Sequence, residues 1–92
     1  MTEISKINFR IWALCQDNMR RGENIDASLA REDDARRAAM IMKSRFPNTP
    51  DFDPEPYESY RAFVRKETAK ADAEIAALRE RLKELHNNGA EV

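Results

Sequence analysis

The stretch that decides the fold is PNTPDFDPEP, residues 47–56, because it contains all four prolines of the chain. Proline lacks the backbone N–H that a helix interior needs, and the residue before each proline is pushed toward extended geometry. The same stretch carries Asp51, Asp53 and Glu55 without a basic side chain. It therefore predicts a Pro-rich acidic connector between helical segments.

Downstream of the connector, the sequence predicts one uninterrupted helix over residues 54–86. Asp53 is a natural N-cap, and Pro54 suits the first helical position. From residue 71 onward the apolar spacing alternates between four and three, as in a coiled coil. Residues 71–86 are therefore a candidate coiled-coil extension. The full apolar stripe is Tyr57, Tyr60, Val64, Thr68, Ala71, Ile75, Leu78, Leu82 and Leu85.

Upstream of the connector, the pattern predicts two further helices over about 5–21 and 26–45. Basic residues followed by Gly22 are typical of a helix C-terminus, and Asp26 is a suitable N-cap for the next helix. The first helix has an apolar arc of Ile4, Ile7, Ile11, Trp12, Leu14, Cys15 and Met19. The second has a weaker face of Ala35, Ala38, Ala39, Met42 and Phe46. The expected fold is all-α, with three helices in a single small domain over residues 1–92.

The third predicted helix is too long for the other two. At 1.5 Å per residue it forms a rod of roughly 50 Å, whereas the others span roughly 25–30 Å each. Its end carries Ile75, Leu78, Leu82 and Leu85, each worth about 1.5–3 kcal/mol when buried. Either the shorter helices dock along different parts of it, or these four residues form an oligomer interface in a homodimer.

Composition limits the classes of function. The chain has 92 residues, 41% of them hydrophobic and 36% charged, and its formal net charge of −1 gives no global attraction to nucleic acid. Cys15 is the only cysteine, so an intrachain disulfide cannot form. The N-terminal residues lack the apolar run of a signal peptide, and no stretch approaches the ~20 apolar residues of a membrane span. A cytoplasmic location is the expectation.

The sequence offers no set of residues for catalysis, cofactor binding or metal binding. The only histidine, His86, falls at the end of the last helix, where it complements the helix dipole. Cys15 lies on an apolar face and is expected in the core. The carboxylates of Glu32, Asp33 and Asp34 are followed by arginines that keep them ionised rather than poised for acid catalysis. We therefore expect a protein that is not an enzyme.

The connector and the helix start after it form a candidate partner-binding surface. Its aromatic members are Phe52, Tyr57 and Tyr60, framed by the carboxylates of the connector, Asp51, Asp53 and Glu55. Aromatic side chains are frequent energetic centres of protein interfaces. The alternative is that the prolines and acids cap the last helix while the aromatics pack back onto the preceding helices.

These observations favour a protein-binding module that acts as an adaptor, regulator or inhibitor of a larger macromolecular complex. Such a role suits the small accessory proteins that phages and mobile elements encode. The alternative is a small nucleic-acid-binding regulator, since two helices joined by a short turn resemble a helix-turn-helix layout. Its contacts would come from Arg20, Arg21, Arg31, Arg36 and Arg37.

Overall fold

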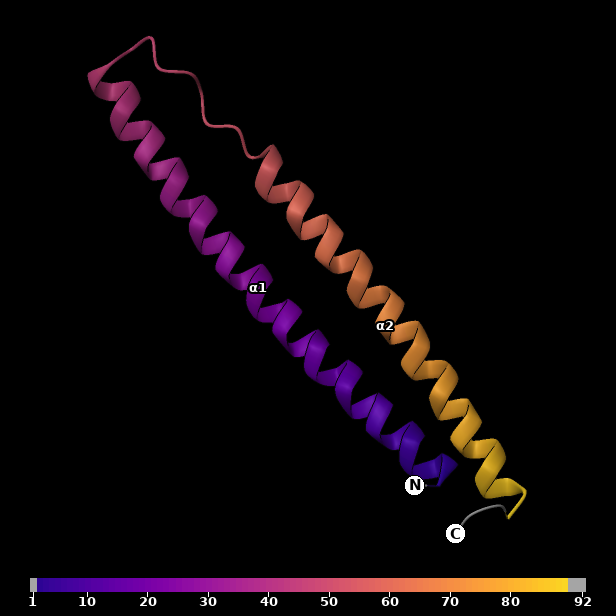
Figure 1. Ribbon diagram of the computed structural model, residues 1–92. Helices are drawn as coiled ribbons and strands as arrows, with labels where there is room; N and C mark the ends of the chain where they lie inside the picture. Colours follow the sequence, from indigo (N-terminus) through magenta and orange to yellow (C-terminus); the bar gives the residue numbers. More distant parts are fainter. Residues whose placement is uncertain (1, 90–92) are drawn as a thin grey trace.

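A computed structural model describes residues 2–89 and shows an all-α chain folded into a helical hairpin (Figure 1). Helix α1 spans Glu3–Arg45, helix α2 spans Glu55–Asn87, and residues 46–54 connect them. The two helices run side by side and antiparallel, so the start of α1 and the end of α2 lie at the same end of the molecule (Figure 1). The hairpin measures 71 × 16 × 14 Å. It is a rod rather than a globule.

The described residues form two helices, so the prediction of three helices is wrong. The predicted stop at Gly22 and the predicted N-cap at Asp26 both lie inside α1, which is continuous for 43 residues. Glycine in a helix interior costs about 1 kcal/mol. Continuing the helix keeps Ser28 and Glu32 turned toward Arg61 of α2. These contacts, together with the unbroken backbone hydrogen bonds, outweigh the local preference for a break.

The fusion of the two predicted helices also reverses the expected length mismatch. At 1.5 Å per residue, α1 is about 65 Å long and α2, with 33 residues, about 50 Å. The long α1 therefore covers the stripe on α2 that was expected to need a cover. Ile75 and Leu85 are buried, Leu78 packs against the core, and Leu82 is half-buried. The cover that the stripe requires lies within the chain itself.

The core is a narrow seam between the helices. Its buried apolar members are Ile7, Leu14, Val64, Ala71, Ile75 and Leu85. Because each helix has one neighbour, only a narrow stripe can be covered. Trp12 and Met19, which the sequence pattern placed on the apolar arc of the first helix, are therefore 58% and 61% exposed. Met42 and Phe46 from the second predicted face are also exposed.

Local signals set the helix ends. The Thr2 hydroxyl oxygen accepts a hydrogen bond from the Ser5 backbone N–H at 3.1 Å, which caps α1. The predicted N-cap of α2, Asp53, lies one residue before the observed N-cap, Pro54. Asp53 Oδ1 nevertheless accepts a hydrogen bond from the Glu55 backbone N–H at 3.0 Å. Gly89 follows α2 with φ of 66°, the left-handed conformation that glycine accepts readily. The predicted range of 54–86 for this helix is correct to within one residue at each end.

Candidate protein-interaction surfaces

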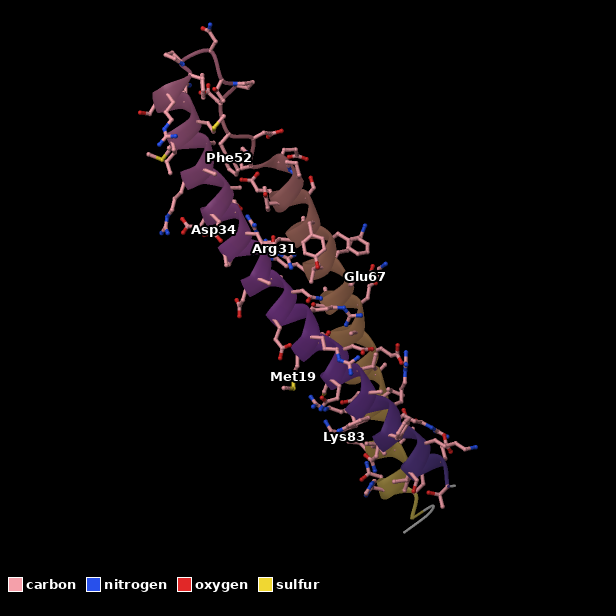
Figure 2. The ribbon with its side chains drawn as sticks, turned by 60° about the vertical axis from the view of Figure 1, so that its left-hand side comes forward. Met19, Arg31, Asp34, Phe52, Glu67 and Lys83 are labelled. Atoms are coloured by element: carbon pink, nitrogen blue, oxygen red, sulfur yellow. The ribbon has the colours of Figure 1, made fainter. Side chains whose placement is uncertain are left out.

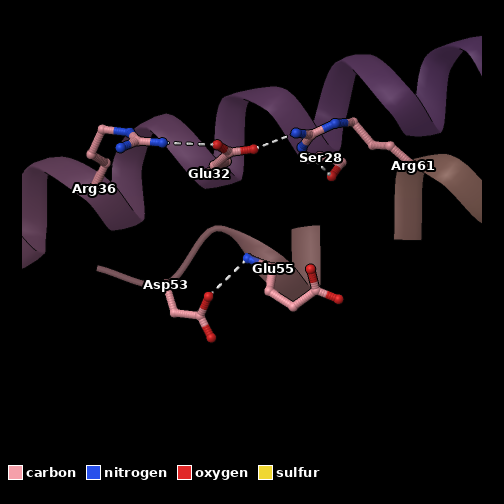
Figure 3. A network of polar contacts seen from close by, with 6 residues as sticks. All are labelled: Ser28, Glu32, Arg36, Asp53, Glu55 and Arg61. Atoms are coloured by element: carbon pink, nitrogen blue, oxygen red, sulfur yellow. Dashed lines mark hydrogen bonds and ion pairs between the residues drawn. The ribbon is translucent and has the colours of Figure 1, made fainter. Parts of the chain in front are cut away.

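A buried polar network crosses the middle of the hairpin (Figure 3). Arg61 is only 7% exposed, and its Nη2 lies 2.5 Å from Glu32 Oε1. Arg61 Nη1 donates to Ser28 Oγ at 3.3 Å, and Arg36 Nη2 donates to Glu32 Oε2 at 3.1 Å. No hydrogen bond of good angle reaches Glu32 Oε1, so its contact with Arg61 is best described as a close ion pair. The network ties one level of α2 to one level of α1.

The network also fixes the charge on Glu32. Its contact with Arg61 holds the pKa of Glu32 below its ordinary value, with support from Arg36 and against the opposing effect of desolvation. A carboxylate held ionised in this way accepts hydrogen bonds but is poorly suited to donate a proton. We therefore assign Glu32 a structural role.

One long edge of the hairpin carries cross-helix ion pairs. Arg10 Nε lies 2.7 Å from Glu74 Oε2, and Arg81 Nε lies 3.0 Å from Glu3 Oε1. The hydrogen bond from Arg10 holds the pKa of Glu74 below its ordinary value. At 100° per residue, every charged side chain between residues 3 and 22 of α1 falls within an arc of about 100°. We call this arc of α1 the charged edge; it comprises Glu3, Lys6, Arg10, Asp17, Arg20 and Arg21.

The connector folds back on the hairpin through the predicted aromatic residue Phe52. Phe52 is half-buried, with the Arg36 guanidinium carbon 4.6 Å from its ring centre and the Tyr57 ring centre 6.0 Å away. Asp51 pairs with Lys43, and Asp53 accepts a hydrogen bond from the Glu55 backbone N–H. Four predicted members remain on the surface: Asp51, Asp53, Glu55 and Tyr60. Tyr60 is 44% exposed, and Glu55 accepts a hydrogen bond from Ser59.

The connector end of α1 carries large apolar side chains on several sides. Met40, Ile41, Met42 and Phe46 are 68%, 58%, 47% and 59% exposed, and we call these four residues the apolar tip. The three consecutive residues 40–42 project at steps of about 100°, so they surround the helix rather than share one face. A hollow of about 310 Å³ lies beside them, lined by Arg36, Ala39, Met40, Lys43, Pro50, Asp51 and Phe52. This surface was not predicted from the sequence, although Met-Ile-Met at adjacent positions is the signal for it.

A second exposed apolar surface lies on α1 nearer its start. Phe9, Trp12 and Met19 are 58–61% exposed, and the Phe9 and Trp12 ring centres are 5.9 Å apart. Figure 2 shows Met19 extending outward from the ribbon. A groove of about 520 Å³ follows this side of the hairpin, lined by Cys15, Asn18, Met19, Asp72, Ile75, Ala76 and Arg79. The surface is open and elongated rather than a closed pocket.

The arginines of the nucleic-acid alternative are not gathered into one patch. Residues 20–37 belong to a single straight helix, and the predicted turn between two short helices does not exist. Arg36 and Arg37 are engaged with Glu32 and Asp33, and Arg21 donates to Asn18. Arg31 lies near Tyr60 in a separate hollow. The helix-turn-helix layout therefore does not form.

The described residues contain no cluster of three or more His, Cys, Asp or Glu side chains arranged to hold a metal ion. Neither α1 nor α2 has a segment that is both long and apolar enough to cross a membrane. Comparison of the chain with protein-family models, with curated proteins and with solved structures found no match.

Proposed function

We propose that this protein is a non-enzymatic protein-binding module whose apolar tip inserts into a socket on a larger partner. The exposed tip is the observation that carries the proposal. Large apolar side chains that project from several sides of a helix are normally covered by packing. Here α1 extends beyond the start of α2, and the connector contacts it on one side through Phe52 and Asp51. A partner would cover the remaining sides.

The residues of the tip suit such a contact. Methionine is flexible and polarizable, and it adapts to irregular apolar surfaces. Phe46 adds an aromatic side chain, a type enriched in interface cores. Three of the four basic side chains in residues 35–46 pair with carboxylates of the chain itself, so charge around the tip is largely balanced. The partner we propose is therefore a protein with an apolar socket.

The proposal is tested by affinity capture from nuclease-treated lysate of the source cells. The bait is the full chain, compared with Ile41→Glu at the tip and with Phe63→Glu as a matched control. Ile41 is 58% exposed and Phe63, on α2 away from the tip, is 61% exposed, so neither change touches the core. The expected result is a specific protein that both wild type and Phe63→Glu retain and that Ile41→Glu loses.

Circular dichroism of each bait shows whether the hairpin is intact. Equal retention of the same proteins by wild type and Ile41→Glu would reject the tip as the binding site. Recovery of nucleic acid alone, before nuclease treatment, would reject protein binding in favour of the nucleic-acid alternative.

A further inference from the structure

The hairpin exposes far more surface than a compact chain of its mass. Its accessible surface is 6,968 Å², whereas a folded monomer of 10.7 kDa is expected to expose about 5,500 Å². The radius of gyration of 21.4 Å likewise exceeds the roughly 12 Å of a globular chain of this length. The excess of about 1,500 Å² is larger than the ~800 Å² per partner that a standard interface buries. The monomer therefore has enough spare surface for a stable dimer.

Part of this excess surface lies on α1 and carries no charged side chains. Between residues 3 and 22, all charged side chains of α1 lie on the charged edge, which leaves the opposite arc free of charge over about five turns. Large apolar side chains stand on this arc: Phe9, Trp12 and Met19, all more than half exposed. Burying these three side chains against another molecule removes apolar surface from water.

The neighbouring strip of α2 carries small side chains among charged ones. Ala69, Ala73 and Ala76 are exposed at steps of four and three, so they share one face of the helix. Ala76 lines the same groove as Met19, and the charged side chains of Asp72 and Arg79 line that groove with them. We call Phe9, Trp12 and Met19 the uncharged face of α1, and Ala69, Ala73 and Ala76 the alanine strip of α2.

We infer that a second copy of this chain packs on the uncharged face to form a four-helix dimer. In a two-fold arrangement with the axis along the rod, α1 of one copy lies over α2 of the other. Large side chains then meet alanines at the same level, and the helix spacing stays even along the contact. The alternative axis, across the rod, sets Trp12 against large side chains and alanine against alanine. In that pairing the two α1 helices must lie far apart to fit the large side chains, while the two α2 helices must lie close together for the alanines to touch.

This dimer is independent of the proposed partner at the apolar tip, since the two surfaces lie at different levels of α1. The axis along the rod places both tips at the same end of the dimer. The dimer would then present both apolar tips to the proposed partner at the same time.

The dimer is tested on the purified full chain by sedimentation equilibrium and by tryptophan fluorescence on dilution. Trp12 is the only tryptophan, so the emission maximum reports directly on the uncharged face. The expected result is a dimer at micromolar concentration, with emission that shifts to longer wavelength as the dimer dissociates. Trp12→Glu is expected to raise the dissociation constant at least about tenfold. Phe63→Glu is the matched control and is expected to leave it unchanged.

Both substitutions are at exposed positions, and helicity measured by circular dichroism confirms that each variant is folded. A folded wild-type monomer at roughly 50–100 µM would overturn the inference, because a dimer with a micromolar dissociation constant is populated at that concentration. So would a dimer that Phe63→Glu disrupts and Trp12→Glu does not. Because no partner is present, failure here leaves the proposed function at the tip untouched.

The packing of α1 of one copy over α2 of the other is tested by a distance measurement between the two copies. A spin label at Ser44→Cys, in a Cys15→Ser background, reports the distance between the two tips of the dimer. An axis along the rod predicts a label separation below about 40 Å, given helix spacings of 8–10 Å. An axis across the rod predicts about 90 Å, because each label lies about 30 residues from the centre of the uncharged face. The longer distance would overturn the same-end arrangement.

Discussion

Arg61 is the residue that couples the two helices most closely. Its guanidinium is buried between Glu32 and Ser28 of α1, at a level where an apolar residue would continue the seam. A buried ion pair adds little net stability over an apolar pair, but removing one partner leaves an uncompensated charge. The role of Arg61 is therefore best tested by removing the two charges separately and together.

Glu32→Gln is expected to lower the thermal midpoint, because it leaves the buried Arg61 guanidinium without its counter-charge. The double variant with Arg61→Met is expected to recover part of that loss, since both buried charges are then gone. Thermal denaturation followed by circular dichroism measures the coupling between the two positions. Strictly additive effects would show that the ion pair contributes nothing to the folded state.

Glu32 and Glu74 determine how the stability of the hairpin changes at acid pH. Arginines hold the pKa values of both carboxyl groups below their ordinary range. A depressed folded-state pKa means that the unfolded chain takes up protons first as the pH falls. The stabilisation is fully present above the ordinary glutamate pKa of about 4.3 and is lost as the pH falls through the lowered values. We expect the thermal midpoint to fall below about pH 5 and the fall to be shallower in Glu74→Gln. Glu23→Gln, at an exposed position without an ion pair among the described residues, serves as the control and should retain the wild-type slope.

At the scale of the element, α1 shows how tertiary contacts override a local stop signal. Gly22 sits inside the helix with no atom within 4 Å of where a Cβ would lie, and its φ is not among the positive values. Alanine at this position should therefore improve helix propensity at no steric cost.

Gly22→Ala is expected to stabilise the hairpin by about 0.5–1 kcal/mol. Urea denaturation measures the change, with an unaltered slope against denaturant showing that the folded and unfolded states are otherwise the same. A destabilised variant would mean that Gly22 adopts a conformation outside the helix, as the three-helix prediction required. Gly89→Ala provides the contrast, because its φ of 66° makes an alanine there strained.

The comparison of α2 with α1 shows what the sequence could predict. Both ends of α2 were predicted within one residue, because Asp53 and Gly89 act on the backbone nearest to them. The continuity of α1 was not predictable in this way, since it depends on contacts with Arg61, 29 residues beyond Glu32 in the chain. The connector aromatics were identified as notable residues, but the fold places Phe52 against Arg36. The apolar tip was missed because its exposure follows from the unequal helix lengths.

At the scale of the whole molecule, the hairpin is not equally supported along its length. The buried cluster of Leu14, Ala71 and Ile75 lies toward the end that holds the start of α1. Near the connector, α1 has passed the start of α2 and its large side chains are exposed. Helices short of tertiary packing are marginal in water, so the stability of α1 should decrease toward residue 45.

We expect amide hydrogen exchange to reveal this gradient in the free protein. Backbone amides of residues 38–45 should exchange at least about tenfold faster than those of residues 10–20, since they open locally without unfolding the core. Uniform protection along α1 would show that the tip is stabilised without a partner, and would weaken the argument that its exposed Met40 and Ile41 await a cover. Adding the captured partner should slow exchange at the tip selectively. Association of two copies should instead slow exchange around Trp12, so one measurement separates the two surfaces.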